Sequence, residues 1–153
     1  MWRRFLLLLG LLSVLALSPA ATAEAPAGGG PVGIVVETGA AHGIYHIGER
    51  VELRLTVDRD AYVWVYNVSA AGEMKQVFPN VWEEDNLLHA GVTRTVPGTS
   101  AYSFVAAPPL GSEQVVVVAL ARLPGGADPT QAGVAVATYE VRPAVPGGGG
   151  PIL

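Results

Sequence analysis

The chain has 153 residues, a formal net charge of −4 and no cysteine, which excludes disulfide bonds, thiol catalysis and a lipid-modified cysteine. Half of its residues are hydrophobic, so the length suffices for one domain with a real core. The few basic residues are dispersed, and an acidic chain has no electrostatic reason to bind nucleic acid or an anionic membrane surface.

The first 23 residues have the order of a secretory signal peptide. Arg3 and Arg4 precede an apolar run of 13 residues at 5–17, and small residues then provide a cleavage site between Ala23 and Glu24. A membrane-spanning helix needs roughly 20 apolar residues, so a membrane anchor is disfavoured. We therefore expect an exported protein without a membrane span, which is periplasmic, associated with the cell envelope or secreted. Removing residues 1–23 leaves 7 basic and 13 acidic residues, a formal net charge of −6.

Segments rich in Gly and Pro flank the predicted domain on both sides. Residues 24–31 are predicted to be a flexible linker, and residues 143–153 a disordered tail, because neither composition can bury enough apolar surface to fold. The folded domain is therefore expected to span residues 32–142.

Within the domain, short hydrophobic runs bounded by turn residues predict strands at 33–38, 51–57, 61–69, 73–78, 91–97, 101–106, 113–122 and 133–142. Strict alternation in the second run places Val51, Leu53, Leu55 and Val57 on one face. Residues 115–121 are apolar on both faces, which predicts a central strand covered on both sides. One short helical turn is expected within 81–91. Seven or eight strands favour an antiparallel, immunoglobulin-like β-sandwich, with a small β-barrel as the alternative.

An aromatic stripe of Tyr62, Trp64 and Tyr66 alternates along the run 61–69. If exposed, these rings could stack on sugars, and if buried they form half of a sandwich core. Because Val63 and Val65 on the opposite face are just as apolar, the core interpretation is favoured.

The segment after Phe78 carries Trp82 and three consecutive acids, Glu83, Glu84 and Asp85. Carboxylate oxygens suit Ca²⁺, but the regular alternate-residue loop of calcium sites is absent. A solvated acidic loop held down by Phe78 and Trp82 is therefore favoured over a metal site. A hydrolase dyad of Glu83 and Asp85 ranks last, because one loop rarely sets two carboxylates about 5–9 Å apart around a substrate.

The histidines do not form a convincing metal motif. His42 and His46 are four residues apart, which would align them on a helix, but Gly43 and Gly48 oppose a helix there. Either His89 or an acid would have to supply a third ligand from elsewhere. Polar loop histidines are the favoured interpretation, and no cofactor is expected.

The order of the motifs over residues 45–123 resembles the bacterial domain of unknown function DUF4384. Its framework combines turn glycines, a tyrosine-led strand, a hydrophobic-Phe-Pro-Asn signature and a later Asn-x-Leu-x-Ala-Gly, here Gly48, Tyr62, Gly72, Phe78, Pro79, Asn80, Asn86 and Gly91. The Pro-Pro-Gly stretch of the family is one residue longer here, at 108–111. The resemblance implies a β-rich accessory module, and it brings no catalytic residues with it.

These observations predict an exported, non-enzymatic accessory module that binds a protein of the cell envelope, with unpaired sheet edges as contact sites. The alternative is a Ca²⁺- or glycan-binding β-sandwich. It would use the acidic loop with Trp82 or the face that carries Tyr62, Trp64 and Tyr66.

Overall fold

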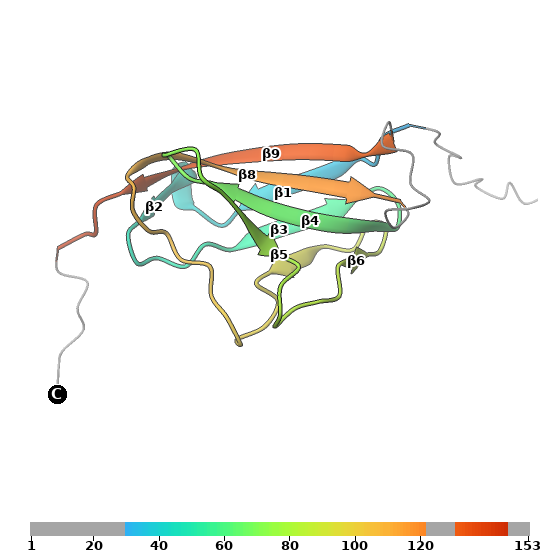
Figure 1. The fold of residues 1–153 in the computed structure, drawn as a ribbon, viewed down its shortest axis with the longest axis horizontal. Coiled ribbons are helices and arrows are strands. Elements are labelled where there is room, and N and C mark those ends of the chain that lie inside the picture. Colours follow the sequence, from blue (N-terminus) through green and yellow to red (C-terminus); the bar gives the residue numbers. More distant parts are fainter. Residues whose placement is uncertain (1–29, 122–130, 147–153) are drawn as a thin grey trace, which may run out of the picture.

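A computed structural model describes residues 30–121 and 131–146 (Figure 1). The predicted signal peptide, residues 24–29 of the linker and the last seven residues of the tail lie outside these ranges. The elements are β1 (Ile34–Thr38), the 3₁₀ turn η1 (Ala41–Gly43), β2 (Ile44–His46), β3 (Leu53–Val57), β4 (Ala61–Val68), β5 (Met74–Phe78), β6 (Leu87–Leu88), β7 (Arg94–Val96), β8 (Gly111–Leu120) and β9 (Gly133–Arg142). No helix in the described ranges is long and apolar enough to cross a membrane.

The strands form two packed sheets, which confirms the β-sandwich. The smaller sheet has the order β1-β3-β7, and the larger has the order β2-β9-β8-β4-β5, with β6 also pairing with β4 (Figure 1). All pairs are antiparallel except β2 with β9. The sheets do not close into a barrel, and the orders β1-β3-β7 and β9-β8-β4 correspond to the A-B-E and G-F-C strands of immunoglobulin-like sandwiches.

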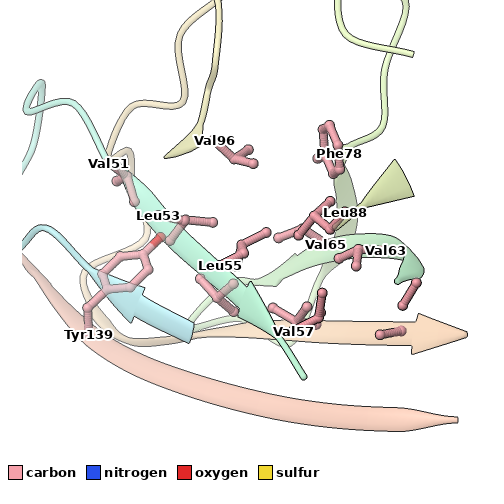
Figure 2. Packing of buried hydrophobic residues seen from close by; sticks show 14 of the residues in the cluster. Val51, Leu53, Leu55, Val57, Val63, Val65, Phe78, Leu88, Val96 and Tyr139 are labelled. Carbon is pink, nitrogen blue, oxygen red and sulfur yellow. The ribbon is translucent and has the colours of Figure 1, made fainter. Parts of the chain in front are cut away.

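The core lies between the inner faces of the two sheets and follows from two-residue alternation. Leu53, Leu55 and Val57 of β3 face β4 and β8 across the sandwich, as Figure 2 shows, and all three are buried. Phe78 and Tyr139 are the largest fully buried side chains, and they lie on either side of these residues in Figure 2. Burial of each such side chain stabilises the fold by about 1.5–3 kcal/mol.

The favoured core interpretation of Tyr62, Trp64 and Tyr66 is wrong. Val63 and Val65 of β4 are the fully buried residues, so the aromatic side chains between them lie on the outer face and are half-buried. The alternation of β4 leaves one set of side chains for the core, and here the valines pack with the leucines of β3. The expectation that residues 115–121 are covered on both faces is also wrong. The outer face of β8 is half-exposed, and no further layer within the described residues covers it.

Two local expectations also fail, and two short strands were not expected. Residues 101–106 do not form a strand, because they bond residues 48–51 only at isolated points, such as the bridge between Arg50 and Val105. Residues 81–91 contain tight turns and β6 in place of a helical turn. β2 and β6 were not predicted, because three and two residues are too short to show a period.

Candidate functional site

Asn80 organises the turn that follows β5. Its amide Nδ2 donates to the carbonyl of Val77 at 2.8 Å, while its Oδ1 accepts the backbone N–H groups of Trp82 at 2.9 Å and Glu83 at 3.1 Å. The backbones of Asn80 and Glu83 also bond each other in both directions. The Asn80 side chain therefore bonds within its own turn, as asparagine side chains in turns commonly do. The turn projects the Trp82 ring outward and directs the Glu83 side chain inward.

Glu83 anchors this loop to the segment that follows β7. The side chain is only 8% exposed, so the expectation of a solvated loop is wrong for this acid. Arg94 Nη2 donates to Oε1 at 2.7 Å, and the Gly98 N–H and the Tyr102 hydroxyl donate to Oε2 at 3.1 and 2.8 Å. Loops 79–86 and 97–110 project together from one side of the sandwich (Figure 1). One carboxylate thus joins loop 79–86 to β7 through Oε1 and to loop 97–110 through Oε2.

The hydrogen bonds at Glu83 outweigh the cost of burying its charge. Burial alone would raise the pKa of Glu83, but the bonds from Gly98, Arg94 and Tyr102 hold it below the ordinary 4.5. Burial and the bond to Glu83 raise the pKa of Tyr102 to about 12. The tyrosine therefore stays a neutral donor to an ionised carboxylate at neutral pH.

The consecutive acids do not converge on a common point. Both oxygens of Glu83 are engaged, Asp85 Oδ1 accepts the Leu87 N–H at 3.1 Å, and Glu84 is exposed without a polar partner among the described residues. Across residues 30–121 and 131–146, no three His, Asp or Glu side chains gather as a metal site would require. The geometry therefore lends no support to Ca²⁺ binding or to a hydrolase dyad in this loop.

The histidines lie in two separate places. His42, in η1 with a φ of 57°, lines a cleft with His46, whose Nδ1 lies 3.6 Å from a carboxylate oxygen of Glu49. His89 instead follows β6, where its Nδ1 lies 3.1 Å from Asp60 Oδ2. The structure does not bring His89 to the other two histidines as a third metal ligand.

A cavity of about 550 Å³ opens between β5 and residues 102–108. Trp82 and Tyr102 line it and stack on each other, with ring centroids 6.1 Å apart and planes inclined by 19°. Trp82 is 60% exposed. Because the Tyr102 hydroxyl is held by Glu83, the acidic anchor also fixes the aromatic wall of the cavity.

Glu113 of β8 lines the same cavity from the inner face of the larger sheet. It is 4% exposed, and its Oε2 accepts the Tyr139 hydroxyl at 2.7 Å and Asn67 Nδ2 at 2.9 Å. Burial and the bond to Glu113 raise the pKa of Tyr139, which also meets the Tyr45 ring edge-on. Glu113 was not predicted as a site residue. Its signal in the sequence was an acid at the inward position of an alternating strand, in register with Val115 and Val117.

The sequence model of a family described as "Domain of unknown function (DUF4384)" matches residues 44–122. The chain belongs to the DUF4384 family. No curated protein and no solved structure matches it significantly.

The framework glycines and asparagines of this DUF4384 domain occupy turns and anchors, whereas Tyr62 and Phe78 lie in β4 and β5. Gly48, Gly72 and Gly91 all have positive φ, at 92°, 84° and 71°, which favours glycine over residues with a Cβ. Asn86 binds β4 through Nδ2 to the Val63 carbonyl at 3.1 Å, and its own carbonyl accepts the Val63 N–H. Glu83, which lies between framework positions, likewise joins separate segments of the chain through its carboxylate.

The larger sheet of the DUF4384 domain also presents an apolar outer surface. Outward positions of β4, β8 and β9 stand side by side in two rows, with Trp64, Val118 and Val134 in one and Tyr66, Val116 and Val136 in the next. With their neighbours, the members of this outer apolar face are Tyr62, Trp64, Tyr66, Val116, Val118, Leu120, Val134 and Val136. None of them carries a charge.

Proposed function

We propose that this DUF4384 domain is an exported, non-enzymatic accessory module of the bacterial cell envelope that binds a partner protein. The observation that carries the proposal is the outer apolar face of the larger sheet. Val134 and Val136 on this face are 64% and 54% exposed, although each lies in a row of apolar neighbours. Contiguous exposed apolar surface of this kind marks interaction sites in soluble domains.

The shape and composition of this face suit another protein surface. Three neighbouring strands, β4, β8 and β9, present aliphatic and aromatic side chains as a continuous layer. A sheet face of this composition buries itself against an apolar surface of a second element. Aromatic residues such as Trp64 and Tyr66 are enriched in the cores of protein interfaces.

A glycan is the weaker candidate for this face. Sugar sites combine an aromatic platform with well-placed polar groups that bond the hydroxyls. The outward polar residues nearest to the apolar rows on β8 and β9 are Gln114 and Thr138, which pair with each other one row beyond Val116 and Val136. The rings of Tyr62 and Trp64 are therefore bordered by aliphatic side chains on β8.

Two further features support the proposal. The signal-peptide pattern of residues 1–23 favours export. An enzymatic role for Glu83 is disfavoured because three donors, from Arg94, Gly98 and Tyr102, already occupy its carboxylate.

The sheet edges expected as contact sites are short, with three residues in β2 and five in β5. The face therefore offers the more extensive contact.

Val136→Glu tests the outer apolar face, and Val35→Glu on β1 of the smaller sheet is a matched control. Both valines are more than half exposed, at 54% and 58%, so neither change buries a charge in the core. Tagged residues 24–153 would be purified from the native envelope fraction, and the captured partner would then be titrated directly. We expect Val136→Glu to weaken partner binding at least tenfold and Val35→Glu to leave it unchanged.

Three results would refute the proposal: a partner retained by Val136→Glu, equal loss in both variants, or no specifically enriched protein for a domain that is also monomeric. Light scattering on the purified domain identifies the case in which the partner is a second copy. In that case Val136→Glu would convert a dimer to a monomer, whereas Val35→Glu would not.

A further inference from the structure

The cavity beside β5 lies on the opposite side of the larger sheet from the outer apolar face. Glu113 lines it from β8, and its neighbours Val115 and Val117 belong to the core between the sheets. The volume of about 550 Å³ falls within the range of roughly 300–1,000 Å³ that small-ligand pockets occupy. Whatever enters this cavity therefore binds independently of a partner on the outer face.

The Glu113 carboxylate accepts hydrogen bonds from the described residues through one oxygen only. The Tyr139 hydroxyl and Asn67 Nδ2 both donate to Oε2, and no described residue donates to Oε1. Glu113 is only 4% exposed, and it lines the cavity. Oε1 is not sealed from solvent, because the one buried side-chain atom without a partner in the described residues is the Tyr45 hydroxyl oxygen. A cationic donor that enters the cavity would compensate the charge of Glu113 as well as bond Oε1.

The remaining walls suit an apolar stem that carries such a cation. Trp82, Tyr102 and Phe104 line the cavity with aromatic surface, and the Trp82–Tyr102 stack is held in place through Glu83. Amphipathic chains bury their methylene stems on surfaces of this kind and place the charged head on a polar group. Aromatic faces also attract cations directly.

The charges around the cavity sum to one negative charge. Glu73, Lys75 and Glu113 are the charged lining residues. Glu73 and Lys75 are exposed, and Lys75 forms no ion pair within the described part of the chain. Lys75 therefore opposes a bound cation through charge repulsion without occupying the Glu113 carboxylate.

We propose that this cavity binds a primary ammonium or guanidinium group on an apolar stem, with the cation at Glu113 Oε1 and the stem along Trp82 and Phe104. Such a group comes either from a small amine or from a lysine or arginine side chain of another protein. The proposal does not depend on the proposed function, because it uses the inner side of the sheet.

The test is an NMR titration of residues 24–153, which contain two indole N–H groups, those of Trp64 and Trp82. The probes are n-butylammonium, the peptide acetyl-Ala-Lys-Ala-amide and neutral n-butanol. We expect both cations to shift the Trp82 signal. The Trp64 signal should not shift, because this residue lies on the outer face, and it therefore serves as an internal control. Butanol should bind about tenfold more weakly or worse, because it lacks the charge. A peptide that binds more tightly than butylammonium identifies a protein side chain as the source, and equal binding identifies a small amine.

Three variants sharpen the test. Glu113→Gln keeps an acceptor for Tyr139 and Asn67 but removes the charge, so binding of both cations should fall about tenfold or more. Lys75→Met removes the repelling charge, so their binding should become stronger. Glu140→Gln, at an exposed carboxylate on the outer side of the larger sheet, should leave binding unchanged.

Equal binding of butanol and butylammonium would overturn the proposal, as would an unshifted Trp82 signal or unchanged cation binding in folded Glu113→Gln. If Glu113→Gln does not fold, the effect of Lys75→Met and the comparison of butanol with butylammonium still test the proposal. Weaker cation binding in Lys75→Met would also contradict the proposal.

Discussion

The DUF4384 domain contains two buried carboxylates that differ in how completely they are bonded. Glu83 has donors on both oxygens, from Arg94, Gly98 and Tyr102. Glu113 has donors on Oε2 alone, from Asn67 and Tyr139. A fully bonded carboxylate is a structural anchor with nothing left to offer a ligand, whereas a half-bonded one beside a cavity retains an acceptor.

The two sites also differ in where their donors come from. The partners of Glu83 lie 11, 15 and 19 residues away, so this anchor joins two neighbouring loops. The partners of Glu113 lie 46 and 26 residues away on β4 and β9, so its position is set by the pairing of the larger sheet. The loop anchor should therefore respond to local substitutions, and the strand site should persist as long as the sheet does.

The largest expected difference is between Glu83→Gln and Glu113→Gln. A glutamine at position 83 must direct its NH₂ group at a donor, because donors face both oxygens. We expect the free energy of unfolding to fall by about 2–3 kcal/mol. A glutamine at 113 can turn its NH₂ group toward the cavity, and the expected loss is less than about 1 kcal/mol. Urea unfolding at pH 7 measures both changes.

Glu84→Gln is the control for charge in this loop. Glu84 is exposed without a polar partner among the described residues, so its loss should change stability by no more than about 0.5 kcal/mol. Equal losses at positions 83 and 113 would contradict the distinction between the two carboxylates.

The second expected effect appears at acid pH. The pKa of Glu83 is lower in the folded chain than its ordinary 4.5, so the folded state binds this proton less readily than the unfolded state. Its contribution is therefore present above pH 4.5 and is lost as pH falls through the folded pKa. The stability gap between wild type and Glu83→Gln should narrow below pH 4.5. The pKa values of Asp58 and Asp60 are also lowered, but their contributions to stability are the same in both proteins and cancel in this comparison. A gap that is independent of pH would exclude an ionised Glu83.

The smallest expected effect concerns Tyr102→Phe, which keeps the stack on Trp82 and removes one donor from Glu83. We expect a loss of about 1 kcal/mol at pH 7. The pKa of Tyr102 is raised from 10.0 to about 12 in the folded chain. Its contribution is thus complete below pH 10 and is lost as pH rises toward 12. The gap between wild type and the variant, measured by urea unfolding, should therefore shrink between these pH values. A stability gap that does not change between pH 10 and 12 would show that the Tyr102 hydroxyl does not stabilise the fold through its bond to Glu83.

Several features of the fold could be predicted from local sequence. The alternation in residues 51–57 identified the buried face of β3, with Leu53, Leu55 and Val57 inside. The turn glycines and Asn80 were also identified, because positive φ and Asx hydrogen bonds are properties of single residues and their neighbours. The face of Tyr62 and Trp64 was not predictable, because both sides of β4 are apolar. The packing of the two sheets against each other decides which set enters the core.

The sequence by itself determined an all-β domain with a DUF4384 framework and favoured a sandwich over a small barrel, because strand periodicity and turn chemistry depend on short stretches of residues. The tertiary structure decided between sandwich and barrel and determined the roles of Glu83 and Glu113. Glu83 became an anchor because Arg94, Gly98 and Tyr102 surround it, and Glu113 faces a cavity because β4 and β9 supply donors to only one of its oxygens. Hydrogen-bond saturation depends on partners distant in sequence, and strand periodicity contains no information about them.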